Sequence, residues 1–168
     1  MHETDVLRDA FERIRDSVHP AVNGLSLDEL AFRPDAESNS IAWLVWHLTR
    51  IQDDHVAALR GAPQIWVDKG WAERFALPLD VSDTGYGHDA EAVGAVVSDA
   101  ASLLGYFEDV HQATVNYLGT ISDHDLDKVI DSRWDPPVTL GVRLVSVIAD
   151  DLQHVGQASY VRGIVQRR

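Results

Sequence analysis

Four long segments of the chain repeat their apolar residues every three to four positions, and no segment alternates apolar and polar residues over the length of a strand. This period predicts helices near residues 4–23, 40–60, 89–118 and 139–165. In the first segment the apolar face consists of Leu7, Ala10, Phe11, Ile14 and Val18. Four helices of this length, joined by both short and long connections, predict an all-α four-helix bundle.

The boundaries of these segments carry capping and breaking residues. Thr4 is a suitable N-cap for the first helix, and Pro20 is expected to kink or end it before Asn23 and Gly24. The second helix is expected to open at residues 39–40 and to stop at Gly61. The connection 61–88 has no clear period, and a loop of that length is usually functional or contains short helical turns. One such turn is expected within residues 66–75.

The later part of the chain is read in the same way. The segment 89–118 is expected to be one helix ending at Gly119, followed by a short turn over 122–127. Asp135-Pro136-Pro137 excludes helix. The last helix is expected to turn a largely apolar set of side chains inward, namely Val142, Leu144, Val145, Ile148, Leu152 and Val155.

Composition narrows the class of partner. The length of 168 residues fits one domain covering residues 1–168. The formal charge of −13 repels phosphate backbones and anionic membrane surfaces, so neither nucleic acid nor a membrane is expected as a partner. The chain has no cysteine, which excludes disulfides and thiolate ligands of its own. The first residues lack the pattern of a signal peptide, so we expect a cytoplasmic protein.

Two of the eight histidines lie in the middle of predicted helices among apolar residues: His47 and His154. A buried imidazole without a partner costs free energy, so each needs a hydrogen-bonding group or a metal ion. Asp150 lies four residues before His154 and therefore on the same helix face. With His47 from the second helix, this pair could complete a three-ligand site for Zn²⁺, with Ni²⁺ and Fe²⁺ as alternatives.

The spacing leaves alternatives. Asp150 and His154 could form a surface ion pair, and Asp151 could replace Asp150 as ligand or orient it from behind. Asp54 is seven residues from His47, roughly 10 Å along the helix, so the two cannot share a metal ion. Asp53, Asp54 and His55 are therefore interpreted as a solvated or capping cluster.

Two segments resemble the DinB-like superfamily. The stretch Ser40–Leu48 is similar to the family's second helix with its embedded histidine, and Asp151–Ala158 is similar to its last-helix motif, a histidine before Gly-Gln. The segments Gly70–Phe75 and Thr84–His88 resemble the actinobacterial mycothiol transferase-like branch. The similarity extends from the first helix to Gly163.

The resemblance implies a four-helix bundle with a long connection between its second and third helices and a divalent metal ion inside. Many members place two histidines four residues apart on the last helix, whereas this chain has Asp150 at the earlier position. The mycothiol-dependent maleylpyruvate isomerases resemble it better, because they have a carboxylate there. The resemblance thus implies His47, Asp150 and His154 as the metal ligands.

The implied activity is a metal-dependent S-transferase that uses a low-molecular-weight thiol such as mycothiol and an electrophilic acceptor. Trp46 and Trp71 could form walls of an acceptor pocket, and Arg50 or Arg162 could meet a carboxylate or sugar of the cosubstrate. Two alternatives stay open: a metal-binding stress protein without transferase activity, and a metal-dependent hydrolase with Asp151 as base. A second copy of the chain is a further candidate partner, and the acceptor itself is not specified.

Overall fold

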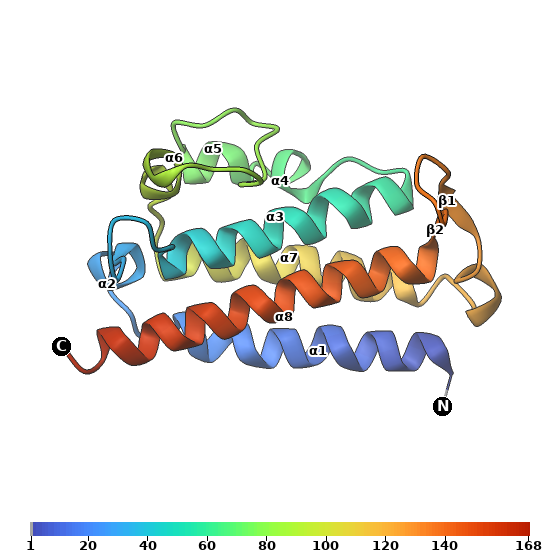
Figure 1. The fold of residues 1–168 in the computed structure, drawn as a ribbon, viewed down its shortest axis with the longest axis horizontal. Coiled ribbons are helices and arrows are strands. Elements are labelled where there is room, and N and C mark those ends of the chain that lie inside the picture. The colour runs from blue at the N-terminus through green and yellow to red at the C-terminus, as the bar shows by residue number, and fades with distance from the viewer. Residues whose placement is uncertain (1) are drawn as a thin grey trace.

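The computed structural model describes residues 2–168 and is built around four long helices (Figure 1). These are α1 (Glu3–Val22), α3 (Ile41–Arg60), α7 (Ala100–Leu118) and α8 (Leu140–Val165). Helices α1 and α3 each pack against both α7 and α8. The predicted all-α four-helix bundle is therefore confirmed.

The bundle closes over a continuous apolar core to which all four long helices contribute. Its fully buried side chains include Phe11 and Ile14 from α1, Leu44 and Leu48 from α3, and Phe107 from α7. Burial of side chains of this size stabilises the fold by roughly 1.5–3 kcal/mol each. Within residues 2–168, no helix combines the length and apolar character needed to cross a bilayer.

The predicted boundaries of α3 and α8 agree with the structure, because both helices carry side-chain caps. Ser40 Oγ accepts a hydrogen bond from the Trp43 backbone N–H, and α3 ends at Gly61 in the left-handed conformation. The Thr139 side chain caps α8 in the same way, through the Val142 N–H. Helix α1 starts at Glu3, one residue before the predicted start, and continues through Pro20 to Val22.

The segment 89–118 is two helices rather than the one predicted. Helix α6 (Ala90–Ala95) ends in an extended stretch at Val96, and α7 begins after Asp99. The Asp99 carboxylate accepts a hydrogen bond of 2.7 Å from the Ser102 N–H, so it caps a new helix. An aspartate inside an apolar period therefore marks a helix start that the period alone does not reveal.

The inward face of α8 also differs from the prediction. Val142, Val145 and Leu152 are exposed, whereas Val147, Asp151 and Ala158 point into the core. Because α8 is apolar on more than one side, a period of 3.6 residues is compatible with two neighbouring sets of inward-facing residues. The charged Asp151 belongs to the set that is buried, and its charge favoured the other set in the prediction.

The connections contain short elements. Between α1 and α3 lies α2 (Leu27–Ala31), and between α3 and α6 lie α4 (Ile65–Asp68) and α5 (Trp71–Phe75), two turns where one was expected. A 3₁₀ turn (Asp123–Asp125) precedes an antiparallel hairpin of β1 (Val129–Asp131) and β2 (Val138–Thr139), which the sequence did not predict. Figure 1 places this hairpin at the end of the bundle where α3 finishes and α8 starts.

Candidate metal centre

Three potential ligands converge between α3 and α8. His47 comes from α3, and Asp150 and His154 come from successive turns of α8. One ligand atom from each residue lies within 4.8 Å of the other two. The two imidazole rings have centroids 4.8 Å apart and lie edge to face. The structure thus brings together the three residues that the sequence pattern singles out.

Both imidazoles are held through the nitrogen that faces away from this cluster. His47 Nδ1 donates to the carbonyl oxygen of Thr84 at 2.5 Å, and His154 Nδ1 donates to Gln157 Oε1 at 2.8 Å. Because a carbonyl and an amide oxygen only accept, each Nδ1 carries the proton and each Nε2 keeps its lone pair. Outer hydrogen bonds of this kind orient histidines that bind metal ions.

The carboxylate of Asp150 completes the cluster. Its Oδ1 lies 3.6 Å from His154 Nε2, and its Oδ2 is buried without a hydrogen-bond partner among the described residues. The Asp150 and His154 side chains are 34% and 18% exposed, so the cluster is open to the groove between the helices. A buried carboxylate oxygen without a partner costs free energy that a bound cation would recover.

The electrostatics of the two histidines differ. Burial lowers the pKa of His47, which keeps that imidazole neutral and able to donate its lone pair to a cation. The neighbouring Asp150 carboxylate, which would accept a hydrogen bond from protonated Nε2, raises the pKa of His154, so a metal ion would compete with a proton there. Burial opposes ionisation of Asp150, but the interaction with His154 outweighs it and lowers the pKa of the carboxyl group.

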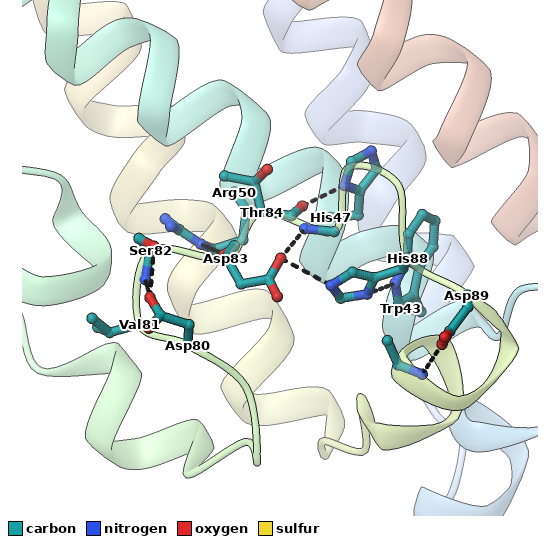
Figure 2. Close-up of polar contacts among 12 residues, drawn as sticks. Trp43, His47, Arg50, Asp80, Val81, Ser82, Asp83, Thr84, His88 and Asp89 are labelled. Carbon is teal, nitrogen blue, oxygen red and sulfur yellow. Dashed lines mark hydrogen bonds and ion pairs between the residues drawn. The ribbon is translucent and has the colours of Figure 1, made fainter.

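The loop that follows α5 positions His47 (Figure 2). The Asp83 carboxylate receives hydrogen bonds from the Gly85 N–H and from His88 Nε2, and His88 Nδ1 accepts from Trp43 Nε1 at 3.1 Å. Gly85 has φ +92°, and a Cβ atom there would lie 2.7 Å from His47 Nδ1. Glycine is therefore required where the loop passes the imidazole.

The indole of Trp43 covers the other side of His47. The two rings are stacked with centroids 4.6 Å apart, and the same indole meets His154 edge to face at 6.1 Å. The donor set of two imidazole nitrogens and one carboxylate oxygen, on a rigid pair of helices, fits a divalent ion that keeps open coordination positions.

Asp151 is not part of this cluster. Its side chain is completely buried in the bundle core, and neither oxygen has a hydrogen-bond partner among the described residues. Burial raises the pKa of Asp151 well above its ordinary value, and the neighbouring charge of Asp150 adds to the shift. In this position Asp151 cannot take a proton from a molecule in the groove.

Of the residues expected to meet a cosubstrate, Trp46 and Arg50 both lie against Trp66, whereas Arg162 lies near α1. Trp46 is buried against Trp66, and Arg162 reaches the carbonyl of Ala21 on α1. Trp71, expected to form a pocket wall, is buried and donates to Asp109. The role of Trp46, Arg50 and Arg162 in binding a cosubstrate stays a prediction.

Arg50 belongs to a second buried polar cluster on α3. Its side chain is 0% exposed and donates to the Asp83 carbonyl and to Gln64 Oε1. Asp53, one turn further along, accepts hydrogen bonds from three donors: the Ile65 N–H, the Trp66 N–H and the Tyr106 hydroxyl. We call this set the Arg50–Asp53 cluster. Asp53 is buried rather than solvated, and because it accepts from the first two N–H groups of α4 it caps that helix and fixes it to α3, in agreement with the capping alternative.

Two cavities of about 790 Å³ each have residues of both α3 and α8 in their walls, one along the second half of α8 and one at its start, and neither is lined by His47, Asp150 or His154. The first, here called the amide-lined cavity, is bordered by Leu44, Gln153, Gln157 and Tyr160. The second, here called the hairpin-end cavity, is bordered by His55, Arg143 and the β-hairpin. Neither is lined by Trp46, Arg50 or Arg162.

Sequence reasoning missed the groups that orient the histidines. Thr84 acts through its backbone carbonyl, which no side-chain pattern reveals, and Gln157 entered the sequence analysis only as the glutamine of the Gly-Gln motif. The sequence feature that could have indicated the role of this loop is the pair of glycines Gly85 and Gly87, which both adopt positive φ. A tight loop of this kind indicates close approach to another group.

Comparison with known proteins agrees with the fold. The DinB superfamily model matches residues 10–158. A solved structure described as a conserved protein from Enterococcus faecalis is 32% identical, with a TM-score of 0.93, over 100% of this chain and 99% of its own. The search of curated proteins gives no match. With a family match over most of its length and the matching architecture, the chain belongs to the DinB superfamily.

Proposed function

We propose that this protein is a metal-dependent S-transferase that joins a low-molecular-weight thiol, such as mycothiol, to an electrophilic acceptor. The observation that carries the proposal is the position of the cluster of His47, Asp150 and His154, which shares α3 and α8 with two cavities large enough for small molecules. A transferase needs two substrates to meet at one reacting centre.

The three side chains would hold the ion, and the groups behind them would keep them in place. Thr84 and Gln157 fix the imidazoles, so little reorganisation is needed when the ion binds. A divalent ion bound there lowers the pKa of a coordinated thiol and supplies thiolate at neutral pH. The chain has no cysteine that would compete for the ion.

The amide-lined cavity suits the non-reacting part of the thiol. Gln153 and Gln157 offer amide donors and acceptors, Ser38 and Asn39 add polar groups, and the exposed ring of Tyr160 offers a flat apolar surface. Groups of this kind bind hydroxyl-rich molecules such as the sugar portion of mycothiol. Gln157 also bonds to His154, so this cavity adjoins the metal cluster directly.

The reaction balances as a nucleophilic substitution. The S–H bond of the thiol breaks and its proton passes to solvent, while a C–S bond forms to the electrophilic carbon. The leaving group, such as bromide, departs with the bonding electron pair. Binding both reactants in one groove would supply the proximity that accelerates a bimolecular step.

The test has two stages. Untagged protein, purified without chelators, is analysed for bound Zn, Ni and Fe, and His154→Ala serves as the site control. Each metal-loaded form is then incubated with an alkyl bromide and with mycothiol, N-acetylcysteine or glutathione, and the thioether is measured by mass spectrometry. We expect metal-dependent product with mycothiol that His154→Ala lacks. Stoichiometric metal without thioether formation would instead favour a metal-binding protein of another function.

A further inference from the structure

The hairpin-end cavity has a charge pattern that distinguishes it from the rest of the groove. Three carboxylates and three cationic side chains line it: Asp54, Asp125, Asp131, Lys128, Arg133 and Arg143. The rest of the wall is largely apolar and includes Leu59, Tyr117 and Ile121. The cavity therefore combines apolar surface with charges that sum to zero, in a protein whose net charge is −13.

Each of the three carboxylates already has a donor of its own. Asp54 accepts from Gln64 Nε2 at 2.7 Å, and Asp131 forms a two-pronged pair with the Arg133 guanidinium at 2.8 and 2.9 Å. Asp125 accepts from Lys128 and also from the Ser122 backbone and hydroxyl. Two of the carboxylates are thus neutralised by ion pairs, whereas Asp54 is bonded to a neutral amide and keeps its charge.

Arg143 is the cation that these pairs leave least compensated. Its Nη1 donates to His55 Nδ1 at 3.0 Å, and its Nη2 is 3.8 Å from Asp131, beyond hydrogen-bonding distance. Burial, and next the charge of Arg143, lower the pKa of His55, so the imidazole stays neutral. The guanidinium is 22% exposed and faces a neutral partner on one side and an already paired carboxylate on the other.

We infer that the hairpin-end cavity binds a small organic acid, with its carboxylate on the Arg143 guanidinium and its hydrocarbon part against Leu59, Tyr117 and Ile121. A planar guanidinium matches a carboxylate in shape and charge. Because the charges of the wall sum to zero, a monoanion on Arg143 adds one uncompensated negative charge, whereas a dianion such as a phosphate monoester adds two and is repelled more strongly by Asp54.

The position of Arg143 connects this acid to the metal cluster. Arg143 precedes Asp150 by seven residues, which places it on the same side of α8 and about 10 Å away along the helix axis. An acid held by Arg143 would reach the metal ligands only with its electrophilic carbon on the Asp150 side of the guanidinium, opposite to the wall of Leu59, Tyr117 and Ile121. The identification of this acid as the acceptor rests on the proposed S-transferase function, whereas binding of the acid does not.

Binding is tested on the full chain by titration calorimetry, with and without Zn²⁺, using 4-phenylbutyrate, 4-phenylbutan-1-ol and phenyl phosphate as probes. We expect the acid to bind at least about tenfold more tightly than the alcohol or the phosphate, in both metal states. Arg143→Gln should remove the preference for the acid over the alcohol. Arg13→Gln, a change at an exposed arginine on α1, should leave it intact.

A second variant tests the same cavity in case Arg143→Gln does not fold. Ile130→Glu adds a carboxylate at an exposed residue of the same cavity wall, and we expect it to weaken acid binding about tenfold while circular dichroism stays unchanged. Equal affinity for the acid and the alcohol in the wild type, or unchanged acid binding in both variants, would overturn the inference. Phenyl phosphate binding as tightly as the acid would refute the carboxylate class.

The acceptor assignment has its own experiment. The transfer assay is run with 4-(bromomethyl)benzoic acid and with its methyl ester. We expect a KM at least about tenfold lower for the acid, lost in Arg143→Gln through KM rather than kcat. Equal KM values would refute the acid as acceptor. Absence of transfer with both compounds would refute the proposed function, and the calorimetric result would still decide whether the cavity binds acids.

Discussion

Helix α3 carries two buried polar clusters one turn apart that differ in how completely their atoms are satisfied. In the Arg50–Asp53 cluster, the Asp53 carboxylate receives three hydrogen bonds from elements that pack on the helix. In the metal cluster, Nδ1 of each histidine donates a hydrogen bond to an oxygen outside the cluster. The remaining ligand atoms of His47, Asp150 and His154 face one another. The Asp53 carboxylate is fully hydrogen-bonded and holds α4 and α7 to α3, although Arg50 Nη2 has no partner among the described residues, whereas the facing atoms of the metal cluster include the unpartnered Asp150 Oδ2.

The sharpest way to break this comparison is to remove Asp53. Asp53→Ala leaves the Ile65 and Trp66 N–H groups and the Tyr106 hydroxyl buried without their acceptor, and it removes the carboxylate 3.8 Å from the buried Arg50 charge. We expect a loss of about 3–5 kcal/mol in the free energy of unfolding, measured by urea denaturation. Asp9→Ala, which breaks an exposed pair with Arg13, should cost less than about 1 kcal/mol. Similar losses in the two variants would contradict a structural role for Asp53.

The converse change is made in the metal cluster. His154→Ala should lower Zn²⁺ affinity at least about 100-fold, because it removes a ligand, while the free energy of unfolding of the metal-free protein changes by no more than about 1 kcal/mol. His124→Ala, at an exposed histidine in the 3₁₀ turn, is the matched control. A large loss of metal-free stability would place His154 with the structural cluster.

Two adjacent carboxylates on α8 sharpen the comparison further. Asp150→Ala should weaken Zn²⁺ binding about 10- to 100-fold, whereas Asp151→Ala should leave it within a few-fold of wild type, because the Asp151 side chain points into the core. Isothermal titration with Zn²⁺ gives both values. Equal effects would show that neither carboxylate is a ligand, and the reverse order would assign the ligand to Asp151.

The smallest effect is a difference in titration between the two histidines of the metal-free protein. NMR should give a pKa below 6.5 for His47, which burial disfavours as a cation, and above 6.5 for His154, which Asp150 favours. The raised pKa of His154 stabilises the fold below its unfolded pKa, and this contribution is lost as pH rises through the folded value. For His47 the sign is opposite. Asp150→Asn should lower the pKa of His154, and titration of both residues at the same pH would contradict the cluster geometry.

The apolar period of the sequence predicted the long helices of the fold. Local caps at Ser40, Gly61 and Thr139 made the boundaries of α3 and α8 predictable as well. The break before α7 did not follow, because an N-cap such as Asp99 competes with a period that continues across it. The buried stripe of α8 was predicted correctly at Leu144 and Val155 but not at Val142, Val145 and Leu152, because Asp151 occupies a core position that a charged residue rarely takes.

The candidate site also has a part that the sequence predicted and a part that it did not. The spacing of Asp150 and His154 follows from helix geometry, and a histidine among apolar residues on another helix suggested a partner. The orienting role of the Thr84 carbonyl and the buried position of Arg50 depend on how the connection 61–88 folds back onto α3. That path is set by tertiary contacts among distant residues, which a period or a motif cannot reveal.

The stacking of Trp43 on His47 should make the fluorescence of this tryptophan sensitive to metal binding. Because the indole lies within van der Waals reach of both imidazoles, its emission should respond to whatever ion occupies the cluster. Ions with unpaired d electrons, such as Ni²⁺ in octahedral sites or Cu²⁺, are efficient quenchers of nearby indoles, whereas Zn²⁺ with its filled d shell is not. Because the chain contains no cysteine, a single introduced thiol could carry a dye that reports, by energy transfer from the five tryptophans, whether added metal ions change the spacing of α3 and α8.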